Sequence, residues 1–325
     1  MLFFSNEYYS KFSRSQTNAF TGTFIHLLFN ELISKYNLLP AIPPIFTNNK
    51  HNLLINDSFR TIDFDNLSSS SVLKTIDFID KWLYLYLRQS QVKLNSGIIA
   101  FNYQINRDAN MDELDAISFP YISFAVSISK ENYCQELILN EANKLKNIIN
   151  DVVSKIVIDN IKIKHQILDF NVLEASKVFK HNHYINLQNI LLPKLEKKPL
   201  LITNFLNLEK FYQLLPFAKN NFLHDEINGV LFQRLGSRNL PINLFYIALQ
   251  PTYEQISEAH LLQNSFYKTT LDMVYKNSEW SYVVHINLAN LLIWLLDKQH
   301  YSEIFSGPYG DEFYEAALKN KKDVI

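Results

Sequence analysis

The side chains with the clearest chemical potential form one pair of histidines and one group of acids. His181 and His183 stand two residues apart, so on a strand they would point the same way and could bind a metal ion. No third ligand stands at a matching spacing, and the alternative is a pair of polar surface residues. The acids lie within one eight-residue segment, which is either a ligand-facing loop or a solvated one: Asp108, Asp112, Glu113 and Asp115.

Other types of catalytic site have little support. The single cysteine, Cys134, excludes an intramolecular disulfide and is typical of a reducing compartment. We expect it to pack on a helix, with a nucleophilic role as the alternative. Gly307 and Gly310 lie in SGPYGDEF, which indicates a turn before a helix rather than a phosphate-binding loop. No Ser-His-Asp or Cys-His set can be inferred from the sequence.

Composition narrows the class of protein. Hydrophobic residues make up 47% and charged residues 19% of 325 residues, enough apolar material for a sizeable core. The formal net charge of -1 provides no overall field for nucleic acid or an anionic membrane. The start resembles no signal peptide, and the longest apolar stretch, LLIWLL at 291–296, is too short to span a bilayer. We therefore expect a cytoplasmic protein with one domain, 1–325, that binds neither nucleic acid nor membrane.

Hydrophobic periodicity predicts the elements that would position these residues. Residues 16–36 and 130–156 have helical spacing, although Glu141 interrupts the apolar stripe of the second helix. The prolines at 40, 43 and 44 indicate extended chain after the first helix. Strand patterns lie at 59–67, 97–105, 119–128, 162–170, 228–235 and 241–249. Residues 74–89 are expected to pass from a strand into a helix, and residues 280–299 from a strand or turn into a buried helix. Further helices are expected across most of 172–222 and at 253–275. This order predicts an α/β (α+β) fold with a mixed, mainly antiparallel sheet flanked by helices.

The order of several short motifs resembles one enzyme family across nearly the whole chain. The motifs are LLIND (53–57), DKW (80–82), GII…INRD…DELD (97–115), SKEN (129–132), ING (227–229) and INLANLLIWLL (286–296) before SGPYGDEF. The chain thereby resembles ammonia-dependent asparagine synthetase, the aspartate–ammonia ligase that shares the class II aminoacyl-tRNA synthetase fold. That family activates the side-chain carboxylate of aspartate with ATP and passes it to ammonia.

Part of the family's site is retained in this sequence. The resemblance matches Asp57 to a substrate-binding aspartate, and it matches Lys81 and Trp82 to the lysine and tryptophan of the next motif. Arg107 and Asp108 keep part of the charged loop. The resemblance therefore implies Asp57, Lys81, Arg107 and Asp108 as candidate ligand-binding residues.

Most of the family's catalytic positions are replaced. Leu83 stands where the family has a substrate-facing lysine, and Asn106 stands where it has an arginine that binds ATP. A glutamine and an aspartate on one strand are Phe124 and Val126, which share an apolar face with Ile122 and Ile128. Three more positions are also replaced. Asn243 stands where the family has its metal-binding glutamate, Gln250 where it has the arginine that ends that motif, and Asn290 where it has the ATP-stacking arginine. We expect Phe124, Val126 and Leu83 to fill the space where the family binds its nucleotide.

These replacements predict lost catalysis rather than a false match. A misalignment should not spare Asp57, Lys81, Trp82, Asn228 and Gly229 at their expected places. Each missing cation beside a triphosphate removes a charge-assisted contact of ~1.5–3 kcal/mol. The sequence therefore predicts a catalytically inactive asparagine synthetase-like protein that serves as a binding or regulatory subunit, without cofactor or metal. The alternative is a repurposed ATP-dependent amide-forming ligase or transferase with a more apolar substrate, which would need ATP and Mg²⁺.

The resemblance also implies a dimer built on residues 16–46. It would be a homodimer or a heterodimer with a synthetase-like partner. Phe20, Phe24, Leu27 and Pro43 would then lie near the interface, and the alternative for each is an ordinary place in the core.

Overall fold

The computed structural model is built around an eight-stranded sheet. It describes residues 10–48, 63–64, 73–75, 79–105, 118–159, 161–163, 165–178, 187–204, 227–250 and 280–305, with 315, 317 and 319. In spatial order the strands are β1 (Leu38–Pro40), β5 (Gly97–Ile105), β6 (Ser118–Ile128), β13 (Trp280–Asn287), β12 (Leu240–Leu249), β11 (Asn228–Leu235), β10 (Leu200–Thr203) and β9 (Asn171–Glu174).

The sheet is antiparallel except at its two edges. β1 pairs with β5 and β9 pairs with β10 in parallel, and all pairs between them are antiparallel. A register shift between Leu231 and Phe232 marks an irregularity in β11. The predicted mixed, mainly antiparallel sheet is confirmed.

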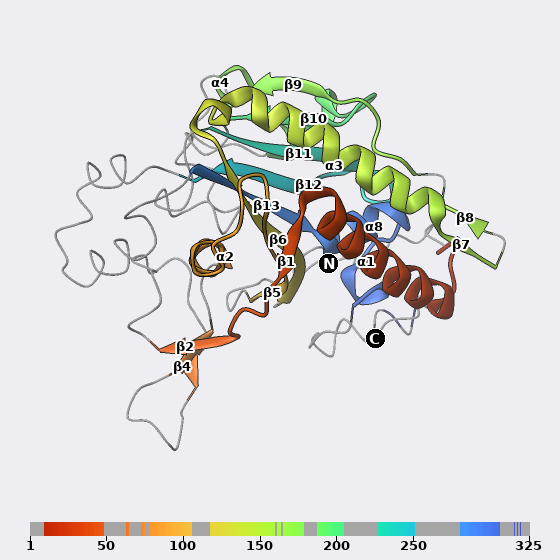
Figure 1. Cartoon of the computed structure of the whole chain (residues 1–325). Helices are drawn as coiled ribbons and strands as arrows, with labels where there is room; N and C mark the ends of the chain where they lie inside the picture. Colours follow the sequence, from red (N-terminus) through yellow and green to blue (C-terminus); the bar gives the residue numbers. More distant parts are fainter. Residues whose placement is uncertain are drawn as a thin grey trace.

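Two long helices cover one face of the sheet side by side (Figure 1): α1 (Arg14–Tyr36) and α3 (Gln135–Lys155). Ser13 and Gln16 form a capping box that fixes the start of α1. The apolar stripes of both helices pack on Phe124, Val126 and other side chains of the same sheet face. We call this side the α1/α3 face.

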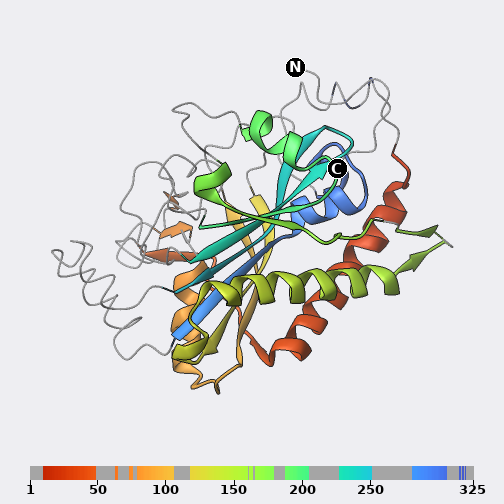
Figure 2. The same ribbon diagram turned by 90° about the horizontal axis from the view of Figure 1, so that it is seen from above.

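Shorter helices cover the opposite face, so the sheet lies between two helical layers (Figure 2). They are α2 (Ile79–Gln89), α4 (Ala175–Val178) and α5 (Leu187–Leu191). Leu83, Tyr84 and Leu87 of α2 belong to a second core that includes alternate residues of the central strands. We call this side the α2 face.

The remaining elements are short. β2 (Phe46–Asn48), β4 (Leu73–Thr75) and β3 (Asp63–Phe64) form a small sheet, and β7 (Val157–Ile158) pairs with β8 (Ile161–Lys162). Helix α8 (Leu288–Leu295) follows β13 directly, and single 3₁₀ turns are η1 (Lys130–Asn132), η2 (Leu192–Lys194) and η7 (Tyr301–Glu303). Among the described helices, none has the length and apolar character needed to cross a bilayer.

Some expected elements differ from the structure. The strand expected at 162–170 is wrong beyond Lys162, since 165–170 form no strand. The described part of 172–222 contains β9 and β10 as well as short helices. Cys134 is exposed just before α3 rather than packed on it. The helix expected at 253–275 lies outside the described residues.

Candidate functional site

Polar side chains gather on the α2 face of the three central strands. Because side chains alternate between the two faces of a strand, the residues in register form successive rows across β6, β13 and β12. The polar rows are Tyr121 with Asn287, then Ser123 with His285 and Tyr246, and, near the far end, Ser127 with Ser281 and Gln250. Between the second and the last row stand Ala125, Val283 and Ala248. We call these polar residues together the polar face.

The middle of the polar face holds a Ser-His-Asp set. With the proton on Nε2, the His285 ring donates to Oδ1 of Asp80 at 2.6 Å. Its Nδ1 then accepts from the Ser123 hydroxyl at 2.9 Å. Asp80 comes from α2, and all three residues are at most 3% exposed. Sequence reasoning missed this set because 205 residues separate Asp80 from His285 and 162 separate Ser123 from it.

Two tyrosines surround the set with neutral hydroxyls. The Tyr246 ring stacks on His285 with ring centroids 6.0 Å apart. Burial raises the pKa of Tyr246 well above its ordinary value, and the nearby Asp80 charge raises it further. Burial also raises the pKa of Tyr121, which accepts a hydrogen bond from Asn287. These hydroxyls therefore stay protonated throughout the physiological pH range.

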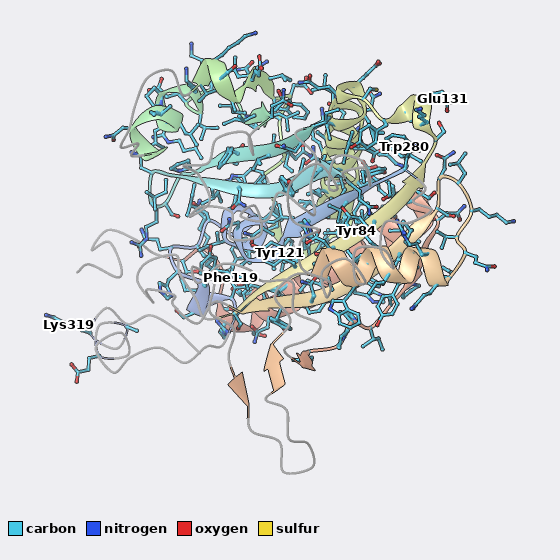
Figure 3. The ribbon with its side chains drawn as sticks, turned by 90° about the vertical axis from the view of Figure 1, so that its left-hand side faces the viewer. Tyr84, Phe119, Tyr121, Glu131, Trp280 and Lys319 are labelled. Carbon is cyan, nitrogen blue, oxygen red and sulfur yellow. The ribbon has the colours of Figure 1, made fainter. Side chains whose placement is uncertain are left out.

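Helix α2 closes this part of the sheet. Figure 3 looks towards this helix, and it labels Tyr84 of α2 and Tyr121 of β6, which belong to the same core. Ile79, Leu83, Tyr84 and Leu87 are all buried there. Removing four such side chains from the core would cost roughly 6–12 kcal/mol. Nucleophilic chemistry at Ser123 requires access that this closed arrangement does not give, so the set works here as a buried link between helix and sheet.

The last row of the polar face contains an unsatisfied donor. Ser281 donates to Oε1 of Gln250, and Tyr133 donates to the Gln250 carbonyl at 2.9 Å. Nε2 of Gln250 is buried and has no hydrogen-bond partner. A buried amide donor left in this state costs about 1–3 kcal/mol.

The replaced family positions do not meet in one pocket. Phe124 and Val126 lie on the α1/α3 face, where the Phe124 ring packs against Tyr36 at 4.9 Å between centroids. Leu83 lies on the α2 face. The expectation that these three fill one nucleotide pocket is therefore wrong.

The physical reason is the two-residue period of a strand. A shift of one residue moves every side chain to the other face, so Leu83 and the pair Phe124 and Val126 cannot all have faced one ligand. Displacing the match on β6 by one residue would replace Phe124 and Val126 by Ala125 with either Ser123 or Ser127. These residues lie on the α2 face.

Two other family positions do come together. Nδ2 of Asn290 on α8 donates to the Asn243 carbonyl at 2.8 Å, and Tyr301 donates to Oδ1 of Asn290. Gln250 lies at the opposite end of β12 from Asn243. Neutral amides thus bind each other where the resemblance places a metal-binding acid and an ATP-stacking cation.

A further buried polar cluster follows α8 and was also missed by sequence reasoning. Nζ of Lys298 donates to Ser10 at 2.6 Å and lies 3.9 Å from Oε2 of Glu303. Glu303 also accepts from the backbone of His300 at 3.1 Å. Burial, and then the charge of Arg238, lowers the pKa of His300 to about 3. This cluster joins the segment before α1 to η7.

The remaining candidates lie outside the described residues. These are Asp57, Asn106, Arg107 and Asp108, the other loop acids, and the histidines His181 and His183. Lys81 lies in α2, but its side chain is outside what the structure describes. Within the described ranges, no three His, Cys, Asp or Glu side chains come together as a possible metal site.

Comparison with known proteins identifies the fold. No family model matches the sequence, and no curated protein matches it. Asparaginyl-tRNA synthetase of Entamoeba histolytica is similar in structure, with a TM-score of 0.64 and 10% identity over 90% of this chain and 67% of that one. The enzyme of Pyrococcus horikoshii, complexed with asparaginyl-adenylate, gives a TM-score of 0.65 and 10% identity over 90% of this chain and 68% of that one. The chain therefore has the class II aminoacyl-tRNA synthetase-like fold.

Proposed function

We propose that this protein is a catalytically inactive relative of ammonia-dependent asparagine synthetase that acts as a binding or regulatory subunit. The observation that carries this proposal is the closed α2 face. Leu83 is fully buried there, at the position that the resemblance matches to a substrate-facing lysine. The structural neighbours support the class II synthetase-like fold that this proposal requires.

The electrostatics of the polar face support lost ATP chemistry. Phosphoryl and adenylyl transfer need fixed cations around the developing negative charge. None of the described side chains that β6, β13 and β12 direct to the α2 face is lysine or arginine. Hydroxyls, amides and one histidine would leave a triphosphate there without the contacts of ~1.5–3 kcal/mol that each cation supplies.

The test is calorimetry with ATP and Mg²⁺, with and without aspartate, followed by an assay for pyrophosphate and AMP release. The inactive protein should show neither micromolar nucleotide binding nor product release. An authentic ammonia-dependent asparagine synthetase under the same conditions serves as the positive control. Pyrophosphate release that depends on aspartate would refute the proposal.

The exposed side of α1 supports a partner-binding role. From Ser15 to Asn30 its exposed residues carry no formal charge, and they include Ala19, Thr23 and His26. The chain that follows adds exposed apolar side chains at Leu39 (51%), Ile42 (93%) and Ile45 (65%). Exposed side chains without charge are typical of the centre of a protein–protein interface.

The outer side of α1 is formed by other residues than Phe20 and Phe24. These two are buried in the core of the chain itself, which is the alternative that the sequence left open for them. Helical spacing places the residues next to them, Ala19 and Thr23, on the outside. The proposed partner is a second copy of the chain or a synthetase-like protein, and it would contact this outer side.

Sedimentation equilibrium of the full chain and of a Thr23→Arg variant tests this surface. A charged side chain in an interface centre should weaken association by at least tenfold while leaving the folded chain intact. Asn143→Arg, on the exposed side of α3, is the matched control. If wild type is a monomer and no synthetase-like protein co-purifies with it, the partner-binding role is wrong.

A repurposed ligase is the second candidate, and the observation in its favour is Gln250. Its buried Nε2 has no partner, and a neutral ligand that accepts a hydrogen bond would satisfy it. Gln250→Leu should then abolish binding of that ligand, whereas in an inactive protein it should only change stability, since it removes the unsatisfied Nε2 donor together with the acceptor of the Ser281 hydroxyl. Thermal unfolding of both forms with a set of carboxamides and amino acids distinguishes the two outcomes.

A further inference from the structure

Helix α2 brings a single carboxylate to the sheet. Asp80 is the only acidic residue of α2, and its side chain is fully buried in the first turn of the helix. The other α2 side chains in this core are Ile79, Leu83, Tyr84 and Leu87, none of which is charged. Asp80 therefore makes a contact of a different chemical kind from its neighbours on the helix.

The group that receives Asp80 is held in a fixed orientation. His285 stands on β13 in the middle of the sheet, and Ser123 binds its Nδ1 at 2.9 Å. This bond leaves Nε2 directed at Oδ1 of Asp80, 2.6 Å away. A hydrogen bond this short to an ionised acceptor is typical of carboxylate recognition. Ala100 and Ala125 flank this contact, and their small side chains leave room for the His285 ring and the Asp80 carboxylate.

Covering the sheet does not itself require a carboxylate. A buried polar pair is often no more stabilising than apolar side chains of the same volume. The apolar residues of α2 already bind this helix to the sheet, so the Asp80 contact serves recognition more than it serves burial.

We propose that the polar face keeps a binding point for a small carboxylate, formed by His285 and Ser123, and that Asp80 occupies it in cis. Helix α2 then fills the site with its own side chain, and we call Asp80 the plug. This inference deepens the proposed function, because it explains what occupies the face of an inactive synthetase-like protein.

Chemical rescue of Asp80→Ala tests the plug. The substitution removes one carboxylate and leaves space of about that size, so formate can enter and accept from Nε2 of His285. Thermal unfolding is measured in sodium formate and in sodium chloride at equal ionic strength. Formate at ten times its dissociation constant should raise the Tm of the variant by about 2 °C or more over chloride. For a variant that does not fold in chloride, the refolded fraction in each salt replaces the Tm.

Four control proteins make the result specific. Wild type and Asp80→Asn, whose binding point is filled, should show equal Tm values in both salts. The double variant Asp80→Ala with His285→Gln should lose the formate effect. Leu87→Ala opens an apolar space on the same helix and should not respond to formate. A formate effect in any of these four proteins, or equal behaviour of Asp80→Ala in both salts, overturns the plug.

The outcome is independent of the test of inactivity. If formate does not rescue Asp80→Ala, the proposed plug is wrong, and the test for ATP turnover is unaffected. Pyrophosphate release would remove the inactive function while leaving the rescue result standing.

Discussion

Leu83→Lys restores the cation that the resemblance expects, and it directly tests whether the site is closed. In the enzyme family this position faces the substrate, whereas here Leu83 is fully buried between α2 and the sheet. In an open polar pocket, lysine would be tolerated and would increase affinity for anions. In a closed core, it would have to bury its amine.

The expected cost follows from burial and charge. Losing the buried leucine costs about 1.5–3 kcal/mol. A buried amine has its pKa lowered by up to about 3–5 units, equivalent to roughly 4–7 kcal/mol at a pH where the unfolded chain is charged. Asp80 lies one turn earlier on the same side of α2 and would offset part of this cost. We expect a total destabilisation of about 5–10 kcal/mol, most or all of the stability of an ordinary domain.

Urea unfolding followed by circular dichroism measures this difference. The loss should shrink as pH rises towards 10, because the unfolded chain then no longer binds the extra proton. Leu83→Met keeps the volume and should cost less than about 1.5 kcal/mol. A Leu83→Lys protein that is as stable as wild type and binds ATP would show that this face is open, and it would refute the closed-site argument.

Three further predictions concern the packing and titration of buried groups. His300 is neutral when folded, with a pKa of about 3, while the unfolded chain takes up a proton below about 6.5. Stability should therefore fall by up to about 1.4 kcal/mol per pH unit as pH drops from 6.5 towards 3, and His300→Gln should flatten this slope in urea unfolding. Gly229→Ala would place Cβ 2.5 Å from a methyl group of α3 and should cost about 1–3 kcal/mol, whereas Gly22→Ala has open space on α1 and should add up to about 1 kcal/mol. Equal effects at both glycines would contradict the packing of α3 on β11. Lys298→Met should cost about 3–5 kcal/mol by leaving the Glu303 carboxylate buried without its cation, and adding Glu303→Gln should recover part of this loss. If Lys298→Met unfolds at the same urea concentration as wild type, the buried Lys298–Glu303 ion pair does not stabilise the fold.

Local patterns were sufficient for most of the sheet and the two long helices. The bounds predicted for 97–105 and 228–235 coincide with β5 and β11, because alternation along a strand is a property of adjacent residues. The capping residues and apolar stripe of α1 are likewise local. The short strands β9 and β10 were missed, since each has only four residues and too little alternation to distinguish it from a helix turn.

The candidate site could be predicted only in part. The resemblance grouped the neutral residues Asn243 and Asn290 in one site, and the two are in direct contact in the structure. It could not give the phase of β6, because a one-residue slip of the match changes no composition or spacing and yet exchanges Phe124 for Ser123 on the face under α2.

By itself, the sequence determined the class of fold and the position of the main elements. These depend on residue type and on short periods along the chain. Only the tertiary structure decided that Asp80, Ser123 and His285 meet beneath α2, because that contact depends on strand order and helix placement. Side chains far apart in sequence become neighbours through the packing of layers, and no local pattern encodes which face of a strand a distant helix will cover.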